Sequence, residues 1–203
     1  MFCNKKQFLI LFVAIVFCIS PFSNTYASEE PVSGTEITVA DLAEMFPEVF
    51  GDDSLSAVAL HIDTTDMRYY RIQNGIEYEL NVYSDGSYDV WVAYPAQIIS
   101  SSKGITDYGQ LFSYYYPIVD GMAQMTAYAR YTYNSSTGIN TITSCVGGGS
   151  EVVLYGWGVY SGIGEVWGNA VSEGYEFIGL NIDLTPKIGS KGLNKSTYTS
   201  DPY

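Results

Sequence analysis

The stretch IEYELNVYSDGSYDVWVAY, which runs from Ile76 to Tyr94, alternates apolar or aromatic residues with polar ones on both sides of Asp85-Gly86. This alternation predicts two β-strands, and an Asp-Gly pair between alternating runs predicts the turn of a hairpin. A two-residue turn would place charged residues opposite apolar ones. A three-residue loop with Gly86 in the left-handed conformation avoids this mixing, and we therefore expect that loop.

The two faces of the predicted hairpin differ in character. One face is apolar or aromatic, with the expected pairs Tyr78 with Tyr94, Leu80 with Val92, and Val82 with Val90. The other face is acidic and carries two aromatic rings, and its members are Glu77, Glu79, Asn81, Tyr83, Asp89, Trp91 and Ala93. Aromatic rings stack on sugars or pack against proteins, while acids and amides hydrogen-bond to hydroxyls. This face is therefore a candidate binding surface formed by Tyr83, Trp91, Glu77, Glu79 and Asp89.

That interpretation has an alternative. Trp91 can instead be covered by a helix, by an aromatic loop or by a second sheet, and it then contributes to the core rather than to binding. The register of the hairpin does not determine whether this face is exposed or covered.

Alternation with many β-branched and aromatic residues recurs from residue 57 onward. It predicts nine short strands, at residues 57–63, 68–73, 76–83, 88–94, 122–134, 139–146, 151–160, 165–171 and 175–184. Residues 107–116 fit either a short helix or an irregular aromatic loop. Because no long helix is available for crossovers, about eight to nine strands favour an all-β fold, an antiparallel sandwich or barrel.

Small residues in two of these strands predict close packing. Ala123, Ala127 and Ala129 lie on one face of the strand at 122–134, which indicates the close approach of a facing sheet. In the strand at 151–160, Gly156 and Gly158 alternate with large residues, which predicts close packing on one side and large rings on the other.

Residues 1–27 predict a cleavable secretory signal peptide. Two lysines precede an apolar run from Phe8 to Ile19, and small residues precede an expected cleavage before Ser28. The run is shorter than the roughly 20 residues that span a bilayer, so no transmembrane segment is expected in the mature chain. A lipoprotein signal at Cys18 is the less favoured alternative, because Phe17 stands where lipid attachment requires a small residue. The predicted location is extracellular.

The remainder of the chain is predicted to form one domain. Residues 28–36 are polar and acidic and predict a flexible leader, and residues 37–203 predict a single β domain. Thr38 and Asp41 resemble a capping box, so a short helix is expected near 39–46, where Pro47 limits its length.

The charge balance excludes two classes of partner. The chain has 22 acidic and 9 basic residues, a net charge of −13. Cleavage would remove Lys5 and Lys6, which leaves seven basic residues and a net charge of −15. Nucleic acids and anionic membranes require clustered Lys and Arg, so neither is expected as a partner.

One cysteine and one histidine remain after residue 27, namely Cys145 and His61. Residues 141–145, Thr-Ile-Thr-Ser-Cys, resemble the strand-end Thr-Leu-x-Thr-Cys signature of sortases, which are exported β-barrel enzymes with an upstream histidine. The resemblance implies an exported cysteine enzyme that uses Cys145 and His61. Sortases also use an arginine shortly after the cysteine, and this chain has none beyond Arg130.

Other familiar chemistry has little support in the sequence. One histidine and one cysteine do not form a zinc shell without distant carboxylates, and Gly147-Gly148-Gly149-Ser150 lacks the lysine of a phosphate loop. Glu77 and Glu79 leave glycoside hydrolysis only formally open. We therefore predict no catalytic residue, metal site or cofactor.

The sequence thus predicts a secreted, non-enzymatic β domain that binds an extracellular polymer, either a glycan or cell-wall component, or a protein. The alternatives are the sortase-like cysteine enzyme and a structural, envelope-associated protein. The oligomeric state is not predicted.

Overall fold

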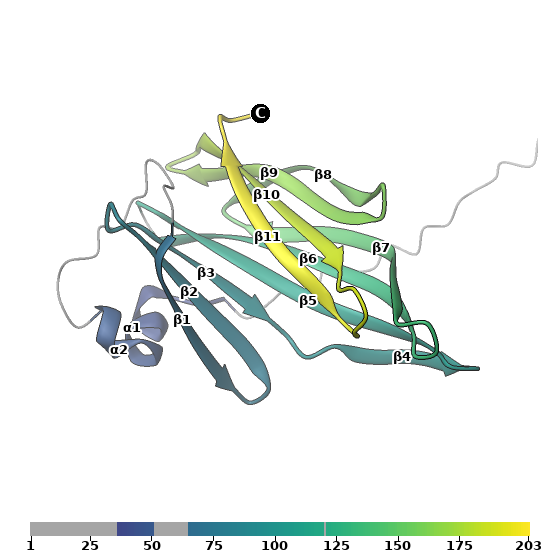
Figure 1. Ribbon diagram of the computed structural model, residues 1–203. Coiled ribbons are helices and arrows are strands. Elements are labelled where there is room, and N and C mark those ends of the chain that lie inside the picture. Colours follow the sequence, from purple (N-terminus) through teal and green to yellow (C-terminus); the bar gives the residue numbers. More distant parts are fainter. Residues whose placement is uncertain (1–35, 51–64, 120) are drawn as a thin grey trace, which may run out of the picture.

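The structure is a computed structural model that describes residues 36–50, 65–119 and 121–203. These residues form two short helices and two antiparallel sheets in a sandwich-like arrangement (Figure 1). The all-β prediction is therefore confirmed. The predicted strand at 57–63 and the predicted signal peptide lie outside the described residues. Among the described residues, no helix is long and apolar enough to cross a membrane.

The larger sheet has seven strands and the smaller one has four. The seven strands are β1 (Thr65–Gln73), β2 (Ile76–Tyr83), β3 (Tyr88–Ala93), β4 (Gln97–Ser102), β5 (Ile105–Ile118), β6 (Gly121–Asn134) and β7 (Ile139–Ser150). Their order is β1-β2-β3-β5-β6-β7, and β4 pairs with β5 beyond the end of β3. The four strands are β8 (Val152–Tyr160), β9 (Ile163–Ser172), β10 (Tyr175–Pro186) and β11 (Leu193–Ser200), with β11 and β8 at the edges.

The hairpin of β2 and β3 has the predicted loop but a different register. The Tyr83 amide donates to the Ser87 carbonyl at 2.8 Å, and Gly86 has a φ of 81°, so the loop has three residues as expected. Closure at Tyr83 places Val82 opposite Tyr88 and not opposite Val90. The expected pairs were wrong by two residues, because they would need a longer loop. The two faces are nevertheless those predicted, since a shift of two residues keeps each side chain on its face.

The aromatic stretch at 107–116 is neither a helix nor a loop. It belongs to β5, a central strand that pairs with β3, β4 and β6. Tyr114 and Tyr116 pack into the core between the sheets, whereas Tyr115 packs against the helices on the opposite face. A strand buried on both faces does not show apolar and polar alternation, which is why the pattern concealed it. The polar edge strand β11 was missed for the opposite reason, because few of its residues are apolar.

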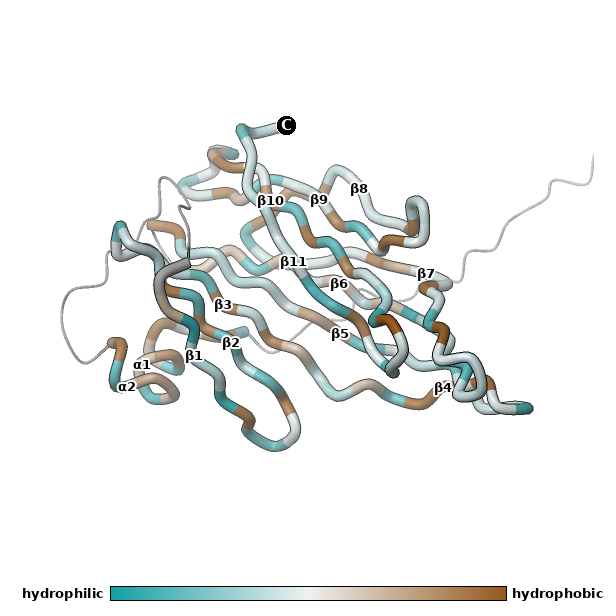
Figure 2. The backbone as a smooth tube through the Cα atoms, in the orientation of Figure 1, coloured by the Kyte–Doolittle hydropathy of each residue, from teal (hydrophilic) through white to brown (hydrophobic). Residues whose placement is uncertain are grey.

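Two apolar cores hold these layers together. Between the sheets, alternate residues of β10, namely Leu180, Ile182 and Leu184, are fully buried, and apolar and polar positions alternate along this strand (Figure 2). Ala127 and Ala129 of β6 are also fully buried there, as predicted. Their small side chains allow the two sheets to approach closely.

The second core lies on the other face of β2 and β3. Helices α1 (Val39–Met45) and α2 (Pro47–Phe50) cover it, and α1 begins with the predicted capping box of Thr38 and Asp41. Leu42 and Phe46 are fully buried against the apolar face of the hairpin, which includes Leu80 and Val90. The helices therefore occupy the apolar face and leave the acidic face to the second sheet.

The helical cover can be tested by truncating its central contact. Leu42→Ala should lower the free energy of unfolding by about 2–5 kcal/mol, because it leaves a cavity beneath α1. Val39→Ala, at an exposed position of the same helix, should change it by less than about 0.5 kcal/mol. Urea unfolding of both variants measures this difference, and equal effects would mean that α1 does not pack on the hairpin.

Candidate functional site

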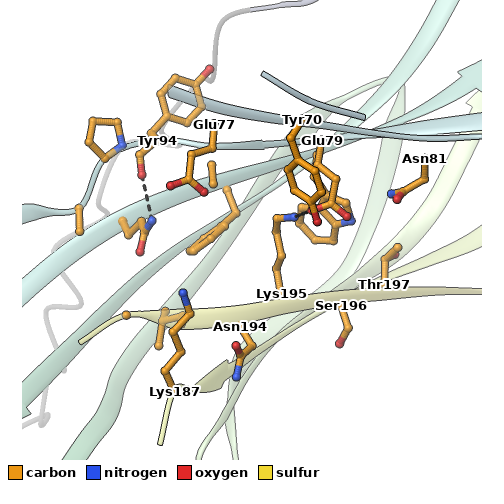
Figure 3. Close-up of a pocket in the computed structure, with 18 of the residues that line it drawn as sticks. Tyr70, Glu77, Glu79, Asn81, Tyr94, Lys187, Asn194, Lys195, Ser196 and Thr197 are labelled. Carbon is orange, nitrogen blue, oxygen red and sulfur yellow. Dashed lines mark hydrogen bonds and ion pairs between the residues drawn. The ribbon is translucent and has the colours of Figure 1, made fainter. Parts of the chain in front are cut away.

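The acidic face of the hairpin does not face solvent freely, because β11 lies across it. Trp91 is 3% exposed and Asp89 is fully buried. Of the covers considered from the sequence, the second sheet is the one the structure shows. A cleft of about 820 Å³ remains between β1–β3 on one side and β11 with the loop before it on the other. Figure 3 shows Tyr70, Glu77 and Glu79 on one wall and Lys187, Asn194 and Lys195 on the other.

The cleft gathers more than half of the Lys and Arg residues that follow residue 27. Seven Lys and Arg residues follow residue 27, and four of them line this cleft, namely Arg68, Lys187, Lys191 and Lys195. The carboxylates of Glu77, Glu79 and Asp89 line it as well. The cleft therefore presents cationic hydrogen-bond donors and anionic hydrogen-bond acceptors together.

Lys195 lies over the Trp91 ring in the cleft. Its ammonium group forms an ion pair with Glu79 and lies 5.2 Å from the centre of the Trp91 ring. A cation above an indole face is attracted by the ring electrons, so the lysine stem and the ring shield each other from water. Trp91 is thus a floor residue beneath Lys195 and not an open stacking platform.

A buried hydrogen-bond cluster forms the floor next to Trp91. The Asp89 carboxylate accepts hydrogen bonds from Asn81 Nδ2 at 2.7 Å, from the Tyr114 hydroxyl at 3.0 Å and from the Tyr83 hydroxyl. Burial raises the pKa of Asp89 above its ordinary value, although these three hydrogen bonds oppose the rise. The cluster fixes the orientation of Asp89 and Tyr83 in a site from which water is largely excluded.

Two further polar atoms at the floor have no hydrogen-bond partner among the described residues. They are the amide oxygen of Asn81 and the hydroxyl of Tyr131, both of which are buried. Leaving a buried polar atom unpaired costs about 1–3 kcal/mol, and the inner faces of a sandwich are normally filled with apolar side chains. A polar interior at this position therefore costs stability relative to an apolar one.

All five binding residues predicted from the sequence line this cleft, and the structure brings them together. Glu77 is exposed, Glu79 is half-buried, and Tyr83, Trp91 and Asp89 are buried. The facing lysines were not among the predicted site residues, because no strand was predicted at residues 193–200. The signal was present in the spacing of Lys187, Lys191 and Lys195, which gather cations in one short segment.

Cys145 lies in a different environment from this cleft. It sits on β7 with its side chain in the core between the sheets and is 4% exposed. Burial raises the pKa of its thiol to about 12, and the nearby Glu165 carboxylate adds to the rise. A thiol that stays protonated is a poor nucleophile. His61 lies outside the described residues, so its distance from Cys145 is not defined.

The described residues contain no group of three or more His, Cys, Asp and Glu side chains arranged to hold a metal ion. No protein-family model matches the sequence, and comparisons with curated proteins and with solved structures found no match either. The geometry of the cleft is therefore the basis for interpreting it.

The buried carboxyl group of Asp89 should make stability depend on pH. Because its pKa is raised in the folded state, the folded protein holds this proton more tightly than the unfolded chain does. The contribution of Asp89 to the free energy of unfolding therefore falls as the pH rises from about 4, the pKa of an Asp in the unfolded chain, through the raised pKa of the folded state. Asp89→Asn should gain stability relative to the unmodified protein over that rise, with Asp201→Asn as an exposed control. Urea unfolding across the pH range measures this, and a relative loss would contradict it.

The burial of Cys145 predicts slow alkylation in the native state. A chain of residues 28–203 contains this one thiol, and iodoacetamide near neutral pH should modify it only after denaturation. Intact-mass measurements before and after addition of urea follow the reaction. Modification of the native protein as fast as a free thiol would restore the cysteine-enzyme interpretation.

Proposed function

We propose that this chain is a secreted, non-enzymatic β domain that binds an extracellular glycan in the cleft between β2 and β11. Secretion is supported by residues 1–27, whose charged start and apolar run are typical of signal peptides. The observation that carries the binding proposal is the polar lining of a cleft of about 820 Å³ at a position where a sandwich would otherwise be packed with apolar side chains.

A glycan suits this lining better than a protein partner does. Sugar hydroxyls both donate and accept hydrogen bonds, so they pair equally well with lysines, carboxylates and amides. The exposed ring of Tyr70 at the mouth offers an apolar surface for the C–H face of a sugar. The central part of a protein interface is instead depleted in Lys, Glu and Asp, which are frequent here.

The two alternative functions have weaker support. A cysteine enzyme would have to use a thiol that is buried in the core and whose pKa is raised. A purely structural protein would gain stability from an apolar interior beneath β11, and the buried unpaired groups of Asn81 and Tyr131 give up part of that gain.

The glycan proposal is tested with residues 28–203 on a glycan array and in sedimentation with insoluble polysaccharides. Tyr70→Ala and Lys187→Ala change exposed residues of opposite walls, and each should weaken binding of the retained glycan about tenfold by loss of a stacking or hydrogen-bond contact. Tyr175→Ala is the matched control, because Tyr175 is 77% exposed and does not line the cleft.

Retention that survives both cleft substitutions, or no retention by any glycan, would refute the proposal. Thermal unfolding of each variant shows that a loss of binding does not come from a loss of fold.

A further inference from the structure

The smaller sheet carries a second aromatic surface on the side that faces away from the core. Because Leu180, Ile182 and Leu184 point inward, the intervening positions of β10 and their paired residues point outward. In Figure 1 the helices lie beside β1–β3, away from β8–β11. We call this surface the outer aromatic face, and its ring-bearing residues are Tyr155, Tyr160, Trp167, Tyr198 and Tyr203.

These rings are accessible. Tyr155, Tyr160, Tyr198 and Tyr203 are each about half exposed, at 48%, 48%, 54% and 53%. They are also grouped, since the Tyr155 and Tyr203 ring centres are 5.9 Å apart and the Tyr160 and Trp167 ring centres are 5.6 Å apart. Four exposed rings therefore lie on one face of the smaller sheet, and exposed patches of large side chains mark interaction sites.

Glycines in the sheet allow the rings to lie against the backbone. A Cβ atom at Gly156 would lie 2.3 Å from the Trp167 ring, and one at Gly158 would lie 3.1 Å from the Tyr160 ring. The predicted close packing at these glycines is thus confirmed. The large rings were expected on the other side, and for Trp167 and Tyr160 this was wrong, because their rings lie on the glycine side. A β-bulge between Leu154 and Gly156 interrupts the alternation of β8, and Tyr155 accordingly shares this face.

Hydrogen bonds hold part of the surface in place. The Tyr155 hydroxyl donates to Glu176 at 2.7 Å, and Asn169 Nδ2 donates to the same carboxylate at 2.6 Å. These two bonds lower the pKa of Glu176, so the group stays charged. The Tyr203 hydroxyl donates to Asn181 Oδ1 at 2.5 Å. The rings of Tyr155 and Tyr203 are therefore oriented before any ligand arrives, which reduces the entropy lost on binding.

The charges on this face have one sign. Glu165 of β9 stands directly opposite Asp183 of β10, and Glu176 lies on the same side. Strands β8, β9 and β10 contain no Lys or Arg, and Lys195 of β11 points into the cleft. Like charges directly opposite each other repel and destabilise a sheet, and a bound cation would reduce this repulsion. The face is therefore complementary to a cationic ligand.

We propose that the outer aromatic face binds a cationic polysaccharide of amino sugars, with sugar rings stacked on Tyr155 and Tyr160 and protonated amines against Glu165 and Asp183. Stacking on aromatic rings requires the apolar face of a pyranose, and the carboxylates select protonated amines over anionic groups. A protein partner fits less well, because Glu and Asp are depleted in protein interfaces. This site uses different residues from the cleft and does not depend on the glycan proposed there.

Isothermal titration with an oligomer of β-1,4-linked glucosamine tests the proposal, with the N-acetylated oligomer and a galacturonic acid oligomer as comparisons. At about pH 6 the amines of the glucosamine oligomer are protonated. We expect binding of the glucosamine oligomer that weakens with added salt, weaker binding of the N-acetylated oligomer and none of the acidic one.

Substitutions then assign the binding to this face. Tyr155→Ala and Tyr160→Ala should each weaken it about tenfold, and Glu165→Gln, which keeps the side-chain shape, about fivefold. Tyr70→Ala, in the cleft, should leave it unchanged. Binding that resists Tyr155→Ala and Tyr160→Ala, or equal affinity for the N-acetylated oligomer, would overturn the proposal. A loss caused only by Tyr70→Ala would assign the ligand to the cleft and would also overturn it.

Discussion

The seven-stranded sheet needs apolar cover on both faces, and this need determines the rest of the structure. Its central strand β5 buries tyrosines on both sides. The helices cover one face of β2 and β3, while the four strands β8–β11 cover the other side of the sheet. Four strands do not cover seven completely. The cleft lies along β11, the edge strand of the smaller sheet, so its position follows from the difference in width between the sheets.

The polar floor of the cleft lowers the stability of this protein. Burial of the Asp89 carboxylate is unfavourable even though this group accepts three hydrogen bonds. An apolar residue would pack against Trp91 without any such penalty. The ion pair of Lys195 with Glu79 links the two sheets across the cleft. The cost of the buried carboxylate is one of the observations that support the binding function proposed above.

The sequence predicted what depends on local pattern and missed what depends on the opposing layer. Asp85-Gly86 identified the hairpin and its loop, and the capping box at Thr38 located α1. Strand β5 was missed because burial on both faces erases alternation. Strand β11 was missed because only one of its faces packs toward the larger sheet and its residues are mainly polar. The five candidate residues were brought together as expected, but their burial depended on β11 and could not be read from the hairpin itself.

Strand β11 belongs to both surfaces at once. Lys195 and Thr197 line the cleft, and Tyr198, opposite Asn181, belongs to the outer aromatic face. The side of each side chain is set by its odd or even position along the strand. A substitution at Lys195 or at Tyr198 therefore alters one surface, whereas the insertion or deletion of one residue exchanges the sides and damages both. The length of β11 and the length of the loop before it are therefore constraints that the two surfaces share.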